Sequence, residues 1–183
     1  TDSTNHYILA GLDHRFNSKS TGVIRAGAQV RDVEGGSSGN SPYVEGSFRT
    51  AINSQLSLRS YVRYGVEDFA RNVFNLNNGI NAFYSNTDTL RIGVTGTYSL
   101  SEDLSLRGGI NYASLNYNDL YVSTFGLGAS SVDEELFNAF VGVNLRVTDN
   151  VFVNARYNFE DLTSDAGRSY DRNRFSLGAS TQF

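Results

Sequence analysis

Apolar and polar residues alternate in segments along the whole chain, and this alternation limits the possible fold more than any other feature. In residues 90–100, Leu90, Ile92 and Val94 occupy one register and polar residues such as Arg91 occupy the other. Successive side chains of a β-strand point to opposite faces, so a period of two gathers the apolar residues on one face. The pattern predicts amphipathic strands of about 9 to 13 residues, roughly the length that a tilted strand needs to cross a bilayer. It predicts no helix longer than a turn or two.

Short polar turns join these segments into hairpins. The turns are predicted at residues 17–20, 53–55, 101–103 and 148–150. The connections between hairpins are longer and polar, at residues 33–41, 70–86, 118–134 and 161–169. Tight turns at one end of the strands and long loops at the other are typical of outer-membrane β-barrels. We therefore expect an all-β fold, an antiparallel meander that forms one transmembrane β-barrel domain or barrel segment over residues 1–183.

The composition agrees with this fold and excludes several others. The 183 residues contain no run of about 18 apolar residues, so a membrane-spanning helix is excluded. The mean hydropathy of −0.33 is polar, but a barrel strand needs an apolar residue only at every second position. The chain has no cysteine, which removes disulfides and thiol catalysis. Its net charge of −4 argues against nucleic acid as a partner.

The charged residues indicate which face is apolar and which is wet. A soluble barrel or β-sandwich is the alternative, because alternation alone does not say which face meets water. A soluble barrel would spread lysine and glutamate over its outside, yet Lys19 is the only lysine. Arginine with occasional glutamate is typical of a polar barrel interior, where one guanidinium can bind several partners. The residues predicted to line the lumen are Arg25, Arg31, Glu45, Arg49, Arg59, Arg63, Glu67, Arg91, Arg107, Arg146, Arg156, Glu160, Arg172 and Arg174. The residues predicted to face lipid include Leu90, Ile92, Val94, Phe137, Val141, Val143, Leu145 and Leu177.

The end of the chain carries a more specific feature. Residues 169–175 read Ser-Tyr-Asp-Arg-Asn-Arg-Phe, and an alternating strand follows that ends on Phe183. This ending is similar to the last strand of bacterial outer-membrane β-barrels. At family level the chain resembles the β-barrel porins of Gram-negative bacteria, some of which accompany polysaccharide-export machinery. The resemblance implies a bacterial outer-membrane location, contact with outer-membrane lipid and lipopolysaccharide, and a role for Phe183 as the assembly signal read by the barrel-assembly machinery.

The number of strands raises a question of closure. We count about nine strands, whereas bacterial single-chain barrels have even strand numbers. If Phe183 lies on the periplasmic side, the first strand begins on the extracellular side. Two alternatives follow: a further hairpin lies within residues 118–134, or the chain is the C-terminal part of a larger barrel that other strands or another chain complete.

Catalytic and metal sites find little support in the sequence. The chain has only two histidines, His6 and His14. His14 falls in the lipid-facing register and Asp13 points the other way, so they do not form a catalytic pair. His6 has only Asp2 and Ser3 nearby in sequence and is expected to be a solvated rim residue. The acids predicted in loops lack the spacing of a calcium site: Asp119, Asp133, Glu134, Glu135, Asp161 and Asp165. We expect no enzyme activity, no metal and no cofactor.

Two functions remain. An arginine-lined lumen would raise the local concentration of anions and favour anionic or sugar solutes, as a porin-like channel or export barrel. Alternatively, arginine and glutamate neutralise each other in a plugged interior, and the extracellular loops of a structural or interaction barrel bind a partner or surface. Lumen size separates the two, because eight to ten strands leave a filled interior and sixteen or more leave water. For a channel, we expect Arg59, Arg91 and Arg107 to ring the periplasmic exit.

Overall fold

A computed structural model describes residues 3–33, 39–67, 73–76, 80–122, 132–165 and 168–181. Its elements are the strands β1 (Ser3–Arg15), β2 (Ser20–Val33), β3 (Gly39–Ala51), β4 (Leu56–Val66), β5 (Val73–Leu76), β6 (Ile80–Ser99), β7 (Leu104–Val122), β8 (Val132–Thr148), β9 (Val151–Ser164) and β10 (Tyr170–Thr181). Within these ranges the regular structure is entirely β. No helix among the described residues is long and apolar enough to cross a membrane.

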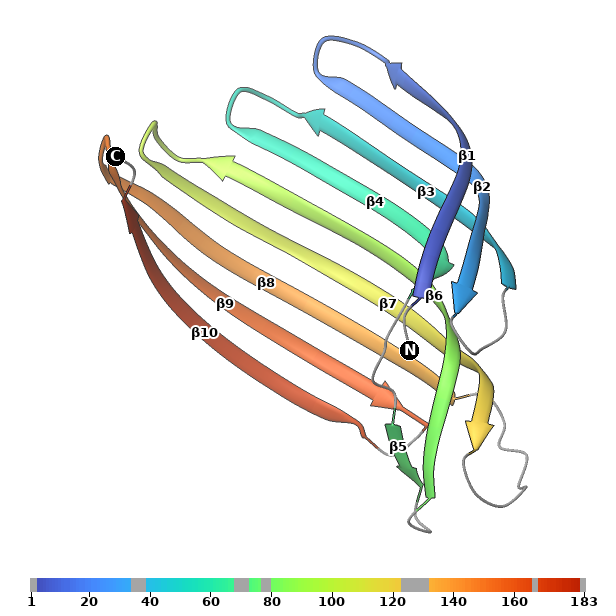
Figure 1. Ribbon diagram of the computed structural model, residues 1–183. Coiled ribbons are helices and arrows are strands. Elements are labelled where there is room, and N and C mark those ends of the chain that lie inside the picture. The colour runs from blue at the N-terminus through green and yellow to red at the C-terminus, as the bar shows by residue number, and fades with distance from the viewer. Residues whose placement is uncertain are drawn as a thin grey trace.

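The strands form one antiparallel meander. Its order is β1, β2, β3, β4, β6, β7, β8, β9 and β10, and β5 pairs only with β6. The tight turns of four hairpins lie along one end of the sheet, toward the upper left of Figure 1. The predicted all-β antiparallel meander of nine strands is therefore confirmed. Because the order is strictly antiparallel, the first and last strands, β1 and β10, run in the same direction.

Several strands are longer than the sequence predicts. β6 has 20 residues, β7 has 19 and β8 has 17, so parts of the predicted loops 70–86 and 118–134 are strand instead. The short strand β5 also lies inside a predicted loop. In these extensions polar residues pair, as Asn86 does with Asn118. Polar residues such as these interrupt the alternation of apolar residues in the sequence, so the alternation does not detect these strand ends. Residues 123–131, where a further hairpin is one of the predicted alternatives, lie outside the described residues.

One face of the sheet is apolar and exposed. The register aligns Val62, Ile92, Tyr112 and Phe137 in a row across four strands. Large apolar side chains continue along this face onto both edge strands, where Ile8 and Leu177 are each 72% exposed. An apolar surface that extends over the whole sheet needs an apolar environment. The residues predicted to face lipid all share this face.

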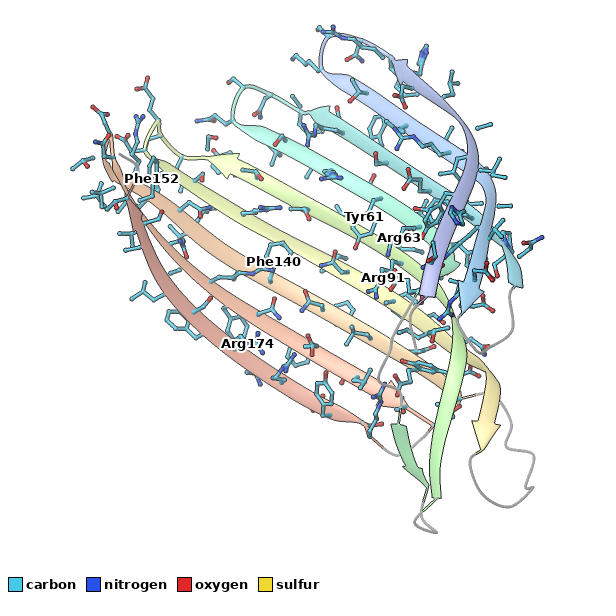
Figure 2. The ribbon with its side chains drawn as sticks, in the orientation of Figure 1. Tyr61, Arg63, Arg91, Phe140, Phe152 and Arg174 are labelled. Atoms are coloured by element: carbon cyan, nitrogen blue, oxygen red, sulfur yellow. The ribbon has the colours of Figure 1, made fainter. Side chains whose placement is uncertain are left out.

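The opposite face is polar and concave, and Figure 2 shows it toward the viewer. Side chains from strands two apart meet on it: the rings of Tyr7 and Tyr43 lie 5.3 Å apart across β2, and the Tyr61 hydroxyl donates to Asn111 Oδ1 at 3.1 Å across β6. The residue between Tyr61 and Asn111 is Gly93, where an added Cβ would lie 2.4 Å from each. Glycine at this position allows the two side chains to meet.

Candidate functional site

All the arginines predicted to line a lumen lie on the concave polar face, together with Glu45 and Glu160. Glu67 follows the end of β4 on the same side, and its carboxylate binds arginines of this face. The structure divides the predicted residues into arginines with carboxylate partners and arginines without them. Whether this face lines a lumen remains a prediction.

Three of the paired arginines lie in one row across the sheet, which we call the ion-pair row. The row consists of Arg25, Glu45, Arg63 and Arg91, on β2, β3, β4 and β6. Arg25 Nη1 donates to Glu45 Oε1 at 2.8 Å, and the Tyr43 hydroxyl donates to Glu45 Oε2 at 2.9 Å. The carboxylate of Glu45 therefore neutralises the first arginine of the row.

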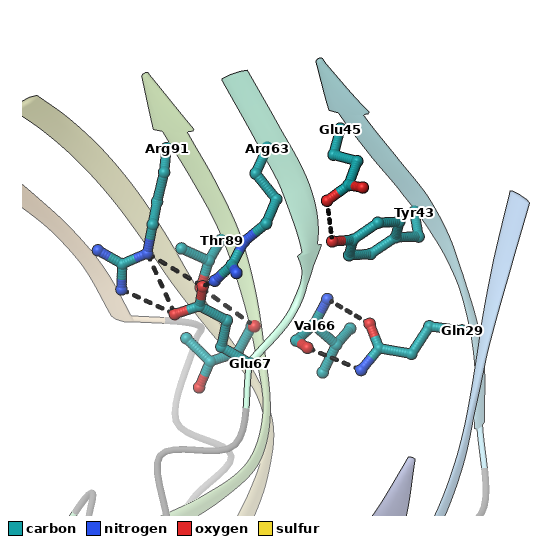
Figure 3. A network of polar contacts seen from close by, with 9 residues as sticks. Gln29, Tyr43, Glu45, Arg63, Val66, Glu67, Thr89 and Arg91 are labelled. Carbon is teal, nitrogen blue, oxygen red and sulfur yellow. Dashed lines mark hydrogen bonds and ion pairs between the residues drawn. The ribbon is translucent and has the colours of Figure 1, made fainter. Parts of the chain in front are cut away.

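Glu67 neutralises the other end of the ion-pair row. Its carboxylate accepts hydrogen bonds from Arg91 Nε at 3.0 Å and Arg91 Nη2 at 2.7 Å, and it also pairs with Arg63 (Figure 3). The backbone N–H of Glu67 donates to the Thr87 carbonyl at 3.0 Å, which fixes the residue beside β6. One carboxylate thus holds two guanidinium groups, and the Glu67 side chain is only 18% exposed. Arg91 was expected to belong to a ring of arginines at the periplasmic exit. The structure does not support this expectation, because Arg91 lies in the middle of the long strand β6 and its guanidinium is paired with Glu67.

Gln29 fills a break in the sheet beside this row. Pairing between β3 and β4 stops at Val44 and Tyr64, and the next positions include Pro42, which has no N–H to donate. The side-chain amide of Gln29 replaces the missing strand contact. Its Nε2 donates to the Val66 carbonyl at 2.8 Å, and its Oε1 accepts from the Val66 N–H at 3.1 Å (Figure 3). Gln29 is only 1% exposed, and nothing in the sequence marked it.

A second cluster surrounds Glu134 near the start of β8. Its carboxylate accepts from the Tyr117 hydroxyl at 2.9 Å and from Ser164 Oγ at 2.6 Å, and it pairs with Arg168. The hydrogen bond to Glu134 raises the pKa of Arg168, which lies between β9 and β10. The prediction that Glu134 is a solvated loop acid was wrong, because the residue lies in strand β8 and its side chain is only 1% exposed. No group of acids and histidines in the described residues has the arrangement of a metal site.

Two other predicted arginines are paired as well, Arg146 with Asp103 at 2.7 Å and Arg172 with Glu160 at 2.5 Å. Four more are arranged differently. Arg49 on β3 lies directly opposite Arg59 on β4. Arg107 lies three residues into β7, as Arg59 does in β4, so both are close to tight turns as predicted. Arg156 stacks on the Phe140 ring, with its guanidinium carbon 4.1 Å from the ring centroid. Among the described residues, no ion pair joins these arginines to a carboxylate.

A polar hollow of about 430 Å³ lies on the concave face between Tyr61 and Glu160. Tyr61, Arg91, Asn111, Asn138, Arg156, Asn158 and Glu160 contribute to its lining. Its asparagines are linked, because Asn111 Nδ2 donates to Asn138 Oδ1 at 3.4 Å and Asn138 Nδ2 donates to the Phe159 carbonyl at 3.1 Å. Such a surface offers both donors and acceptors to a hydrated or hydroxyl-rich solute.

His14 and Asp13 do not form a pair, because they lie on opposite faces of β1. His14 lies on the apolar face, where its ring packs edge to face against Phe16 at 4.7 Å. Asp13 lies on the opposite face, within 3.9 Å of Arg25. The alternating directions of adjacent strand residues keep the His14 and Asp13 side chains apart.

Comparison with known proteins identifies the fold. No family model matches the chain, and no curated protein matches it. Among solved structures, it is similar to a loop-deletion mutant of OmpT, an outer membrane protein of Vibrio cholerae, with a TM-score of 0.59, 17% identity and 97% of this chain covered. In-vitro folded OmpT gives a TM-score of 0.59 at 16% identity, again over 97% of this chain. The fold is that of a bacterial outer-membrane β-barrel. The chain spans about half of these proteins, 53% and 55% of the respective matched chains.

Proposed function

We propose that the chain forms one wall of an outer-membrane channel whose concave face lines a lumen that favours anionic solutes. The observation that carries this proposal is the charge of the concave face. Arginines outnumber carboxylates on it, and several have no carboxylate partner in the described residues. A cleft lined by one sign of charge raises the local concentration of the opposite ion.

The surroundings of the wall follow from its two faces. The apolar face would contact outer-membrane lipid and lipopolysaccharide, because apolar side chains as large as Ile8, Ile110 and Phe175 are exposed on it. Recognition by the barrel-assembly machinery through the C-terminal strand remains part of the proposal, since Phe183 lies outside the described residues.

Closure of the channel requires further strands. β1 and β10 run in the same direction, so pairing them with each other would be parallel. A second copy in the same membrane orientation would again present strands of that direction at its edges. Only an odd number of intervening strands allows antiparallel pairing throughout. We propose that such strands, from the same polypeptide or another chain, complete the barrel and widen its lumen.

A structural or interaction barrel is the second candidate, and one observation favours it. At the end of the sheet away from the tight turns, polar side chains are buried on the concave face, including Thr89, Tyr117 and Glu134. A filled end of this kind is compatible with a plugged interior that leaves the loops to bind a partner or surface.

Planar bilayer recordings of the full-length protein that contains this chain distinguish the two candidates. With a KCl gradient across the bilayer, an anion-preferring channel shifts the reversal potential toward the chloride equilibrium potential. Bilayers that receive detergent alone serve as the control. Absence of conductance from folded protein would favour the structural barrel, and a preference for potassium would contradict the proposed charge selectivity.

A further inference from the structure

Five arginines of the concave face lie between the ion-pair row and the tight turns. We call this set the arginine belt. It consists of Arg49, Arg59, Arg107, Arg156 and Arg174. All five are exposed, and no ion pair to a carboxylate joins any of them within the described part of the chain. Figure 2 shows Arg174 of β10 and Phe140 of β8 on this part of the face.

Most strand residues beside the belt are neutral, and Arg146 near the tight turns is paired with Asp103 at 2.7 Å. Between Arg49 and the turn after β3 lies Ala51, and Ser57 precedes Arg59 on β4. On β9 and β10, the concave positions beside the belt are Asn154 and Ser176. The nearest carboxylates of these strands belong to other pairs, as Glu160 does with Arg172 at 2.5 Å. The belt therefore keeps its positive charge, whereas the ion-pair row is largely neutralised.

Two members of the belt repel each other. Arg49 and Arg59 are direct cross-strand partners, and like charges in this position destabilise a sheet. An anion between the two guanidinium groups would turn this repulsion into a pair of charge-assisted hydrogen bonds. Arg107 extends the positive surface on β7, next to Thr97 of β6.

The far side of the belt combines charge with an aromatic surface. Arg156 lies over the Phe140 ring at 4.1 Å, and its Nη2 donates to Asn158 Oδ1 at 3.4 Å. These contacts hold the guanidinium in place without neutralising it. A solute with several anionic groups could contact the neighbouring guanidinium groups of Arg49 and Arg59 together, whereas chloride could occupy only one position at a time.

We propose that the arginine belt is a binding site for solutes that carry several carboxylate or phosphate groups, and that the ion-pair row does not take part in their recognition. This inference rests on the proposed channel function. It assigns the selectivity to particular residues, so an experiment can contradict the arginine belt as a binding site without contradicting the channel function.

The test measures block of chloride current through the full-length protein by citrate and, separately, by pyrophosphate. The belt variant is R49Q/R59Q, and the matched control is R63Q/R91Q, which removes the same net charge from the same face. We expect citrate affinity to fall at least about tenfold in the belt variant, since each arginine donates charge-assisted hydrogen bonds. The control should stay within about threefold of the wild-type protein, because Glu67 already binds its two arginines. The variant R49K/R59K keeps the charge and should recover part of the affinity.

Each outcome decides a different point. An equal loss in R49Q/R59Q and R63Q/R91Q would show that general lumen charge, not the belt, attracts the anion. Unchanged block in R49Q/R59Q would overturn the site, while the anion preference and the channel function would stand. Stronger block by citrate than by pyrophosphate would assign the site to carboxylates, and the reverse would assign it to phosphates. A wild-type protein that conducts but is blocked by neither would overturn the inference directly.

Discussion

Replacement of Gln29 by alanine should weaken the wall at the break between β3 and β4. In the native sheet the Gln29 amide satisfies both the N–H and the carbonyl of Val66, and it also donates to Asn5 Oδ1 at 3.2 Å. Alanine leaves two buried backbone groups without these partners. Each such group costs about 1 to 3 kcal/mol, so we expect the free energy of unfolding to fall by about 2 to 6 kcal/mol. The adjacent Pro42 has no N–H with which to compensate.

Urea-induced unfolding of the full-length protein in liposomes, followed by far-ultraviolet circular dichroism, measures this change. The chain has no tryptophan, so a backbone signal is the suitable probe of this wall. Gln55→Ala is the control, because Gln55 is an exposed turn residue and its loss should cost less than about 0.5 kcal/mol. A Gln29→Ala protein within about 0.5 kcal/mol of the wild type would refute the reasoning, since the amide would then contribute no more than an exposed side chain.

Three further predictions test the faces and clusters of the sheet. Val141→Arg places a charge on the apolar face and should cost about 2 to 4 kcal/mol in bilayer unfolding experiments, whereas Asn144→Ser on the concave face should cost little; equal costs would contradict the assignment of the faces. Glu134→Gln removes a buried carboxylate that binds three side chains, those of Tyr117, Ser164 and Arg168. It should lower the free energy of unfolding by about 1 to 3 kcal/mol and speed proteolysis between β9 and β10. Unchanged proteolysis would show that Arg168 does not anchor this connection. Gly93→Ala should displace the Tyr61 ring and destabilise the sheet by about 1 to 3 kcal/mol, and a neutral effect would show that the ring moves freely.

The fold could be predicted because membrane strands carry a strong local signal. An apolar residue at every second position, as in Leu90, Ile92 and Val94, fixes both the strand and the face of each side chain. The same parity placed every predicted arginine on one face. The strand extensions could not be predicted, because polar residues such as Asn86 and Asn118 interrupt the alternation of apolar residues in the sequence.

The pairing of the arginines depends on contacts that no local pattern encodes. Arg63 and Arg91 are separated by 28 positions in sequence, and the register between β4 and β6 brings them to one carboxylate. Glu67 reaches both because it lies just beyond the end of β4. Without the register, Arg91 and Arg59 look equivalent in the sequence. In the structure, Glu67 neutralises Arg91, whereas no ion pair joins Arg59 to a carboxylate in the described residues. The ion-pair row and the arginine belt can therefore be told apart only from the pairing of the strands in the sheet.

The direction of the edge strands gives a final prediction, that β1 and β10 are not neighbours in the native protein. The chain has no cysteine, so a pair of introduced cysteines meets no other cysteine of this chain. Oxidation of the full-length protein should not link Ile8→Cys to either Phe175→Cys or Leu177→Cys, all on the apolar face. The control pair, Val62→Cys with Ile92→Cys, lies in direct register on adjacent strands, at a separation that permits a disulfide. It should link readily and so confirm that the oxidation works. Efficient linkage of Ile8 to either β10 position within one polypeptide would mean that nine strands close on themselves through a parallel pair, and the proposal of additional strands and a wide lumen would then fail.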